Sequence, residues 1–207
     1  MTSNERVIKV LLADDENLIR SALAAMLSLE DDLKIIAEAA DGTEALAKAR
    51  ALSPDIAVLD LQMPGLDGVE LAELLTREVP DCRTIIVTSH ARPGYLKRAL
   101  AVGARGFLPK TATGATLADV IRRVADGGRY VDPDLAADAI SAGDSPLTPR
   151  EADVLDAAAD GAPIEEVARR VSLAAGTTRN YLSSAVTKLG ARNRFDACTI
   201  ARQRGWI

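Results

Sequence analysis

The stretch AVLDLQMPGLDG, residues 57–68, decides the fold of the first part of the chain. It begins with an apolar run, places Asp60 directly after that run, and then interrupts regular structure with a proline and two glycines. A short apolar run bounded by turn residues is typical of a strand that is buried on both faces of a parallel sheet. We therefore expect a strand over residues 55–60 that carries the Asp60 carboxylate at its end.

Four further apolar runs, rich in Val, Ile and Leu, alternate with stretches of helical period. The additional strands are expected at residues 7–13, 33–39, 83–89 and 104–110. The helices are expected at Asn17–Leu29, Thr43–Ala51, Gly68–Glu78, Pro93–Val102 and Thr116–Ala125. Five strand-then-helix units predict a doubly wound α/β domain, in which five parallel strands are covered by helices on both faces.

The pattern changes after residue 125. The stretch DGGRYVDPDLAADAISAGDSP, residues 126–146, is rich in Gly, Asp and Pro and predicts a linker with one short helical piece near Leu135–Ile140. Residues 148–206 carry only helical patterning, in four short segments. We therefore expect a first domain over residues 1–127, a linker over 128–143 and a small all-α domain over 144–207.

The composition is that of a globular protein, because 207 residues with 48% hydrophobic content are enough for packed cores. No stretch reaches the about 18 consecutive apolar residues that a membrane-spanning helix needs. The first residues, MTSNERVIKVLLADDE, also lack the apolar run of a signal peptide. We therefore expect no membrane insertion and a cytoplasmic location.

The formal net charge of −5 hides two unlike parts. Residues 1–143 contain 16 Lys and Arg against 22 Asp and Glu, whereas the last 36 residues, from Ser172, contain 6 basic residues and 1 acidic residue. A basic tip on an acidic protein is the charge footprint of a partner with a phosphate backbone. This pattern predicts that the C-terminal domain binds nucleic acid.

Polar side chains follow four of the expected strands at their carboxyl ends. Asp14 and Asp15 follow the first strand, Asp60 closes the third, Thr88 closes the fourth, and Lys110 follows the fifth. In an open parallel sheet these ends share one edge, where ligands bind. Three carboxylates in one cleft repel one another unless a cation lies among them, and an all-oxygen set suits Mg²⁺.

A bound Mg²⁺ would explain this whole set of strand-end residues. The ion would neutralise oxygens of an incoming phosphoryl group while the Asp60 carboxylate attacks phosphorus. The Lys110 ammonium and the Thr88 hydroxyl would bind the remaining phosphoryl oxygens. We therefore predict that Asp60 accepts a phosphoryl group.

Four motifs in this order, LLADDE, AVLDLQMPGLDG, IIVTSHA and GFLPK, resemble the receiver domain of two-component response regulators over about residues 6–127. The resemblance implies a flavodoxin-like, doubly wound five-stranded sheet and phosphorylation of Asp60 by a partner sensor histidine kinase. It also implies that Asp14, Asp15, Asp60 and the backbone carbonyl of Gln62 hold Mg²⁺. No enzymatic activity is implied beyond phosphoryl transfer to Asp60 and autodephosphorylation.

The same likeness implies a switch next to the phosphoryl group. Thr88 would move toward that group, and Phe107 would rotate inward behind it. Gln62 and His90 stand at positions that flank the acyl phosphate in receivers, so both are expected to tune its attack by water.

In the C-terminal part, SPLTPREADVL indicates the start of a helix, with Thr148 as its N-cap and Glu151 completing a capping box. IEEVARRVSL and AAGTTRNYLSSAVTKLG then predict two short helices joined by a tight turn. The second is amphipathic, and its inward stripe is Tyr181, Leu182, Ala185, Val186 and Leu189. Its outward row is Arg179, Asn180, Ser183, Ser184, Thr187 and Lys188.

An outward row of this composition can lie in the major groove of DNA, where Arg and Asn reach base edges while Lys, Ser and Thr hold phosphates. This is a helix-turn-helix pattern. Thr178 is expected to place a hydroxyl against the packing of the second helix, and Thr177 is a candidate N-cap because Ala174 and Ala175 have no capping oxygen. We expect DNA contacts from Thr177, Arg179, Asn180, Ser183, Ser184, Thr187, Lys188 and Arg192.

LTPREADVL, TRNYLSSAVTKLG and ARNRFDA resemble the LuxR-type DNA-binding domain, and with the receiver they place the chain in the NarL/FixJ class of response regulators. Four stretches, RPGYLKRAL, TTRNYLSSAVTKL, NRFDA and the closing RGW, are similar to the DesR group of that class, which pairs with a membrane-thermosensing kinase and regulates fatty-acid desaturation. The resemblance implies a transcription factor that forms a homodimer on phosphorylation and then binds two half-sites of promoter DNA.

Three alternatives use the same residues differently. A metal-dependent phosphatase also forms an aspartyl phosphate, but it needs a second Asp two residues after the nucleophile, where this chain has Gln62. The others are a regulator that binds DNA without phosphorylation and an interaction module with no DNA partner. Salt-dependent binding to DNA, compared with and without a small phosphodonor, separates these functions.

Overall fold

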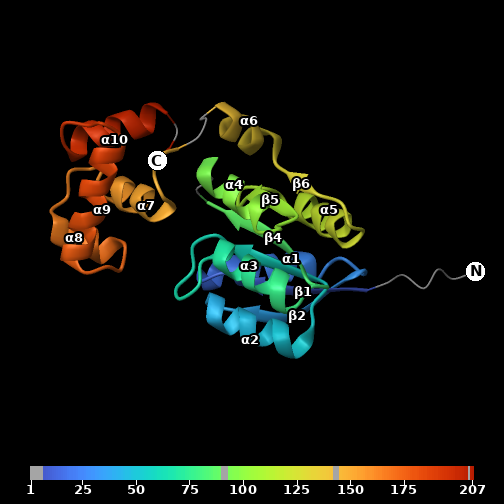
Figure 1. Cartoon of the computed structure of the whole chain (residues 1–207). Coiled ribbons are helices and arrows are strands. Elements are labelled where there is room, and N and C mark those ends of the chain that lie inside the picture. Colours follow the sequence, from blue (N-terminus) through green and yellow to red (C-terminus); the bar gives the residue numbers. More distant parts are fainter. Residues whose placement is uncertain (1–6, 90–92, 142–144, 205) are drawn as a thin grey trace, which may run out of the picture. The chain divides into compact units, whose positions relative to one another are not determined.

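The computed structural model describes residues 7–89, 93–141, 145–204 and 206–207 (Figure 1). These residues form two compact units, each with its own hydrophobic core. Among the described residues, the first unit contains 7–89 and Leu96–Leu135, and the second contains 93–95 and the residues from Ala136 onward. The division between the units therefore falls within the stretch that we interpreted as a linker.

The first unit is built on a parallel sheet with the strand order β2-β1-β3-β4-β5-β6. Its strands are β1 (Ile8–Ala13), β2 (Leu33–Ala39), β3 (Ile56–Asp60), β4 (Arg83–Thr88), β5 (Gly106–Pro109) and β6 (Tyr130–Val131). The strand order reverses between β1 and β3, so the carboxyl ends of these two strands border a crevice. All five residues of β3 are buried, which confirms the strand predicted from the apolar run before Asp60.

Over the described residues the sheet has one strand more than the five that we expected. The additional strand, β6, comes from the stretch interpreted as a linker and lies beside β5, where the Tyr130 N–H donates to the Arg105 carbonyl at 2.9 Å. Two residues are too few to show an alternating pattern, so the sequence could not reveal this strand. The same stretch also forms a complete helix, α6 (Pro133–Ser141), around the helical piece predicted near Leu135–Ile140.

Within the described ranges, five helices flank the sheet: α1 (Asn17–Leu27), α2 (Gly42–Leu52), α3 (Gly68–Glu78), α4 (Pro93–Ala101) and α5 (Gly114–Ala125). Their bounds confirm the predicted helices to within two residues at each end. Leu27 of α1 and Ile121 of α5 pack in one cluster with residues of β1, β3 and β4, so these two helices cover the same face. α2 and α3 pack against each other (Figure 1).

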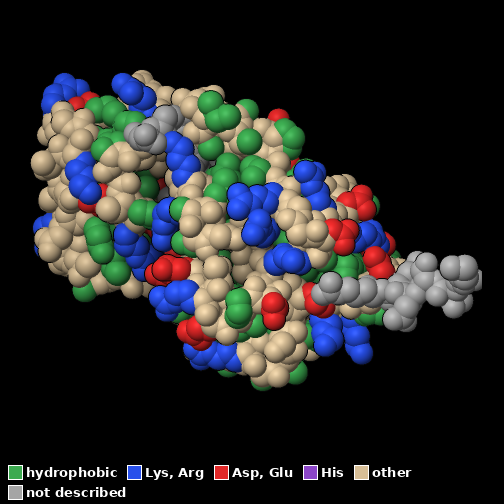
Figure 2. All heavy atoms as spheres, turned by 45° about the vertical axis from the view of Figure 1, so that its right-hand side comes forward, with side chains coloured by type: hydrophobic (Ala, Val, Ile, Leu, Met, Phe, Trp, Pro, Cys, Tyr) green, Lys and Arg blue, Asp and Glu red, His purple; other side chains and the backbone are tan. Residues whose placement is uncertain are grey.

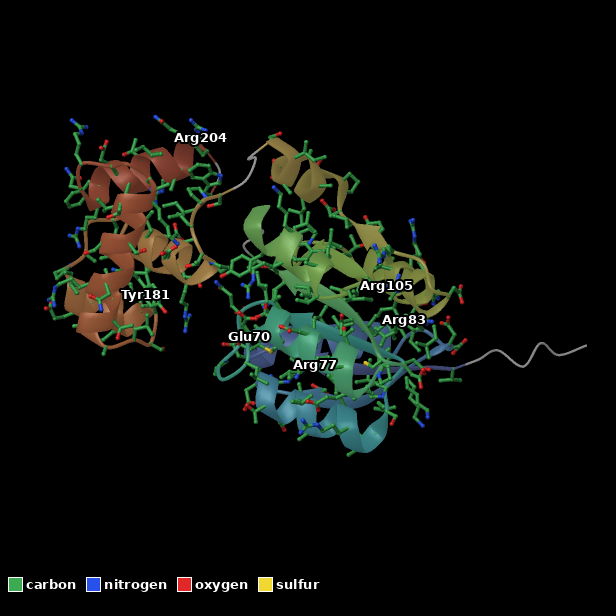
Figure 3. All side chains as sticks on the ribbon, in the orientation of Figure 1. Glu70, Arg77, Arg83, Arg105, Tyr181 and Arg204 are labelled. Atoms are coloured by element: carbon green, nitrogen blue, oxygen red, sulfur yellow. The ribbon has the colours of Figure 1, made fainter. Side chains whose placement is uncertain are left out.

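The residues after Asp60 explain how its carboxylate is held at the edge of the sheet. Gly65 has a φ of +79°, which lets the chain turn back sharply after β3. Gly68 is required for another reason, because a Cβ atom there would lie 2.3 Å from the Asp60 carbonyl oxygen. Asp67 and Glu70 form a capping box at the start of α3, where Figure 3 labels Glu70. The first turn of α3 is therefore packed directly on the end of β3.

In the second unit, four helices follow α6 in the described part of the chain: α7 (Pro149–Ala157), α8 (Ile164–Arg170), α9 (Ala175–Lys188) and α10 (Arg194–Gln203). They confirm the four helical segments predicted between residues 148 and 206. Their common core includes Leu155, Val167, Leu182 and Ala201, with Trp206 packed against it. α8 and α9 are joined by the short turn that the helix-turn-helix pattern predicts.

The face drawn in Figure 2 carries Lys and Arg side chains interspersed with Asp and Glu, and its hydrophobic side chains form only small groups. Among the described residues, no helix is both long enough and apolar enough to span a bilayer.

The buried hydroxyl of Thr84 in β4 is expected to lower the stability of the sheet. Thr84 Oγ1 is buried and has no hydrogen-bond partner among the described residues. Thr84→Val should therefore raise the free energy of unfolding by about 1 kcal/mol, because the unpaired hydroxyl is removed. The measurement is urea unfolding followed by circular dichroism.

Thr76→Val is the matched control for this prediction. The Thr76 hydroxyl donates to the Ala72 carbonyl at 2.8 Å and lies 3.1 Å from the Val102 carbonyl oxygen, so its removal should lower the free energy of unfolding. A loss of stability in Thr84→Val similar to that in Thr76→Val would contradict the prediction.

Candidate functional site

Three of the predicted carboxylates meet at the carboxyl edge of the sheet. Asp14 and Asp15 directly follow β1, and Asp60 is the last residue of β3. One carboxylate oxygen from each lies within 4.8 Å of the others, so the three side chains can share one ligand. Asp14 and Asp60 are only 2% and 5% exposed, whereas Asp15 is exposed and leaves the cluster accessible from solvent.

Lys110, which follows β5, contacts two of these carboxylates and Glu16. Its Nζ is 2.9 Å from Asp14 Oδ2, 3.0 Å from Asp60 Oδ2 and 3.1 Å from Glu16 Oε1. The backbone N–H of Lys110 donates to the Thr88 carbonyl at 2.8 Å, so the end of β4 holds the lysine in place. Glu16 was not among the predicted site residues, although its position directly after Asp14 and Asp15 was a signal for it.

Burial and crowding change the acidity of this cluster. The pKa of Asp60 is raised to about 6, because burial, helped by the negative charge of Asp14, outweighs the lowering by Lys110 and by the Gln62 backbone N–H. Burial would lower the pKa of Lys110, but its contacts with Asp14 and Asp60 outweigh this effect and raise it. Lys110 therefore stays charged, and the carboxylates around it still outnumber it.

The residues present fit a hard divalent cation. Asp14 Oδ2 is buried and touches Lys110 as an ion pair, but it accepts no well-aligned hydrogen bond from the described residues. Carboxylate oxygens with solvent access on one side are the donor set that suits Mg²⁺. A carboxylate and a lysine on either side of such a donor set can also accept and hold a phosphoryl group.

The predicted switch residues lie on the two neighbouring strands. Thr88 is 2% exposed at the end of β4, and Phe107 is completely buried in β5, where it pairs with Ile86 of β4. Gln62 is exposed two residues after Asp60. His90, the second residue expected to tune attack by water, lies outside the described residues.

The inward and outward rows predicted for α9 are largely as the structure has them. Leu182 and Ala185 are buried in the core, and Tyr181, Val186 and Leu189 are half-buried against it; Figure 3 labels Tyr181 on this helix. Thr177, Arg179, Asn180, Ser183, Thr187 and Lys188 are exposed. Ser184 differs, because it is half-buried and donates to Glu151 Oε1 at 2.6 Å instead of pointing outward.

The start of α9 corrects one expectation and confirms another. The N-cap is Ala174, which makes no side-chain capping bond, and the helix begins at Ala175, so Thr177 lies inside the helix and does not cap it. Thr178 is completely buried, and its hydroxyl donates to the Ala174 carbonyl at 3.1 Å. Because that carbonyl accepts the hydroxyl, the buried polar group is satisfied.

Glu151 connects the start of α7 to α9. The predicted capping box with Thr148 is confirmed, and the Glu151 carboxylate also accepts from the Lys188 ammonium at 2.8 Å. Burial would raise the pKa of Glu151, but hydrogen bonds from Lys188, Ser184 and Thr148 outweigh this effect and hold it at about 2. The carboxylate is therefore ionised at neutral pH although it is only 4% exposed.

Arg192, the last predicted DNA contact, follows α9. Its side chain is 84% exposed and pairs with Asp196, which accepts from its Nε at 3.0 Å. Arg194, which was not predicted, donates to the carbonyls of Ala162 and Gly161 and joins α10 to the segment before α8.

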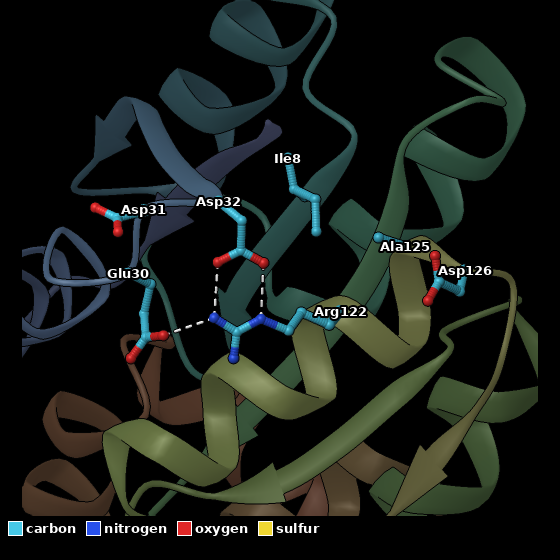
Figure 4. Close-up of a pocket in the computed structure, with 7 residues that line it drawn as sticks. All are labelled: Ile8, Glu30, Asp31, Asp32, Arg122, Ala125 and Asp126. Atoms are coloured by element: carbon cyan, nitrogen blue, oxygen red, sulfur yellow. Dashed lines mark hydrogen bonds and ion pairs between the residues drawn. The ribbon is translucent and has the colours of Figure 1, made fainter. Parts of the chain in front are cut away.

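A second charged cluster lies at the opposite, amino end of the strands. It lines a pocket of about 540 Å³, in which the Arg122 guanidinium of α5 donates to both oxygens of Asp32 at 2.7 and 2.8 Å and to Glu30 at 2.6 Å (Figure 4). The Arg122 hydrogen bonds hold the pKa of Asp32 below its ordinary value. The contacts tie the segment before β2 to α5, which is a structural role.

Comparison with known proteins gives two family matches. The response regulator receiver domain matches residues 10–122, and the luxR family of bacterial regulatory proteins matches residues 145–201. The chain is 38% identical to the transcriptional regulatory protein DesR of Bacillus subtilis, over 97% of this chain and 100% of that protein. It is 32% identical to the DNA-binding transcriptional activator DevR/DosR of Mycobacterium tuberculosis, over 95% of each.

Solved structures agree with these matches. The response regulator ChrA of a heme-sensing two-component system is 29% identical, with a TM-score of 0.57 over 98% of this chain and 100% of that chain. The response regulator RcsB in complex with DNA has a TM-score of 0.62 over 94% of this chain and 98% of that chain; at 23% identity this likeness concerns the fold.

The lowered pKa of Glu151 predicts how the stability of the second unit depends on pH in acid. The pKa of Glu151 is lowered from 4.5 to about 2, so its stabilising contribution is complete above pH 4.5 and is lost as the pH falls toward about 2. The free energy of unfolding should therefore fall over this range in the wild type and fall less in Glu151→Gln. Trp206, the single tryptophan of the chain, reports unfolding of this unit by fluorescence.

Glu165→Gln, at an exposed position of α8, is the control and should keep the wild-type pH dependence. Parallel loss of stability in the wild type and in Glu151→Gln would show that Glu151 does not carry the effect.

Proposed function

Because the chain belongs to the response regulator family, with a receiver domain followed by a LuxR-type DNA-binding domain, we propose that phosphorylation of Asp60 by a sensor histidine kinase controls its binding to promoter DNA. The observation that carries this proposal is the buried Asp60 carboxylate, 3.0 Å from Lys110 and within one cluster of Asp14 and Asp15. A DNA target implies action in the cytoplasm. The proposed domains are residues 1–127 and 144–207, joined by residues 128–143.

In the proposed reaction, a carboxylate oxygen of Asp60 attacks phosphorus of the kinase phosphohistidine. The P–N bond to the imidazole breaks, and an acyl phosphate forms on Asp60. A pKa of about 6 leaves Asp60 mostly ionised at neutral pH, so it can act as the nucleophile. The Lys110 ammonium lies 3.0 Å from Asp60 Oδ2, so it is close enough to donate hydrogen bonds to the oxygens of a phosphoryl group on Asp60.

Asp14, Asp15, Asp60 and the backbone carbonyl of Gln62 would hold Mg²⁺. When bound, the ion supplies positive charge that offsets the charge on the phosphoryl oxygens. Asp14 and Asp60 already point to a common position, and Asp15 adds an oxygen on the solvent side. The phosphoryl group would then also recruit Thr88, with Phe107 rotating behind it, while Gln62 and His90 tune its loss to water.

The DNA-binding proposal is supported by the exposed face of α9. Arg179 and Asn180 are exposed in its first half and carry the groups that read base edges, and Ser183 and Thr187 continue the same surface. Arg192 is exposed beyond the end of the helix. Phosphorylation would favour a homodimer, so that two copies of α9 grip two half-sites together.

Asp60→Ala tests the phosphoacceptor directly. Incubation with acetyl [³²P]phosphate and Mg²⁺ should label the wild type and leave Asp60→Ala unlabelled, because the substitution removes the proposed acceptor carboxylate. Asp31→Ala, an exposed position at the opposite end of the sheet, should label like the wild type. Equal labelling of Asp60→Ala would move the acceptor to another residue.

Mg²⁺ should stabilise the folded chain through the same cluster. At a concentration about ten times its Kd the ion should raise the free energy of unfolding by about 1.4 kcal/mol in the wild type. Asp14→Asn should lose most of this gain, whereas Asp31→Asn should keep it. The measurement is thermal unfolding with and without a chelator, and an equal gain in both variants would contradict the proposed ligand set.

A further inference from the structure

Glu151 makes more contacts with α9 than a capping residue needs. Its Oε1 accepts from Ser184 at 2.6 Å, and its Oε2 accepts from Lys188 at 2.8 Å and from the Thr148 backbone N–H at 2.6 Å. Ser184 and Lys188 are four residues apart and so lie on one face of α9, one turn above the other. A single buried carboxylate therefore binds two successive turns of α9 to the start of α7.

We infer that Glu151 is a positioning residue for α9, and that Lys188 and Ser184 serve as its anchors and not as contacts to DNA. This inference rests on the proposed DNA-binding function and assigns six polar side chains of α9 to two groups. The reading group is Arg179, Asn180, Ser183 and Thr187, and the anchoring group is Ser184 and Lys188.

Electrostatics decides which partner Lys188 takes. Glu151 is 4% exposed, so removing its cation would leave an ionised carboxylate buried without compensation, which is strongly unfavourable. A DNA phosphate is exposed to water and to counterions, and a lysine contact to it is weakened by salt. The buried carboxylate is therefore the stronger partner for the Lys188 ammonium.

The bonds from Ser184 and Lys188 to Glu151 matter more because the start of α9 has no side-chain cap. Ala174 at the N-cap makes no side-chain bond, so the helix lacks the usual device that fixes its entry. Its placement must come from packing of Leu182 and Ala185 and from the bonds to Glu151. Apolar packing sets the depth of a helix, whereas hydrogen bonds at fixed positions also set its rotation and register.

The first experiment measures how binding to a mixed-sequence duplex of about 30 base pairs depends on salt, using the full chain. Each lysine or arginine contact to a phosphate contributes about 0.9 to the slope of log K against log salt concentration. The double variant Glu151→Gln/Lys188→Met leaves no buried charge, and its folding is checked by Trp206 fluorescence. We expect it to keep the wild-type slope, whereas loss of a phosphate contact by Lys188 would reduce the slope by about 0.9 per protomer.

A reduction of about 0.9 per protomer in the double variant would assign Lys188 to a DNA phosphate and overturn the inference. If the wild type itself shows no salt-dependent binding, the proposed DNA-binding function fails and not the role of Glu151.

The second experiment tests positioning. Selection from a pool of randomised duplexes identifies the preferred sequence of the wild type, and discrimination is its affinity relative to the mixed-sequence duplex. Discrimination should fall about tenfold in the double variant, because α9 is no longer held in register. Lys188→Arg keeps the ion pair and should retain the wild-type value. Unchanged discrimination in the double variant would show that Glu151 does not position the helix.

Discussion

The receiver unit depends on one electrostatic constraint: carboxylates from two strands are buried close together, and Lys110 is the cation that the described residues place among them. Asp14 and Asp60 are almost inaccessible to water, so their mutual repulsion is weakly screened. Lys110 contacts both and remains charged, but one positive charge does not balance them together with Glu16 and Asp15. The excess of negative charge favours the binding of a cation at this site. Lys110 can then pair with the negative oxygens of a phosphoryl group on Asp60.

The sequence predicted that these side chains lie together, because the rules that govern their grouping are local. Apolar runs predict buried parallel strands, and the carboxyl ends of such strands meet at one edge, so the sequence alone groups Asp14, Asp15, Asp60 and Lys110. What the sequence could not show depends on contacts between distant residues. β6 is too short for a periodic pattern, and Ser184 turns inward because Glu151, 33 residues earlier, accepts its hydroxyl.

The two units use the same device for different purposes. In the receiver a lysine is surrounded by carboxylates that it cannot fully neutralise, which leaves capacity for a ligand. In the DNA-binding unit a buried carboxylate is satisfied completely, by Lys188, Ser184 and the Thr148 backbone, which leaves a rigid anchor. An incompletely balanced cluster is suited to a reaction, and a balanced one is suited to holding a helix in place.

In the proposed reaction, the Asp60 carboxylate is the acceptor of the phosphoryl group. The most direct measurement is to phosphorylate the full chain, reduce the acyl phosphate with borohydride, digest the product and locate the reduced residue by mass spectrometry. The account predicts reduction at position 60, within the peptide that contains residues 57–68, and none at Asp14 or Asp15. Reduction at either of those aspartates, or unmodified Asp60 in a chain that carries phosphate, would contradict it.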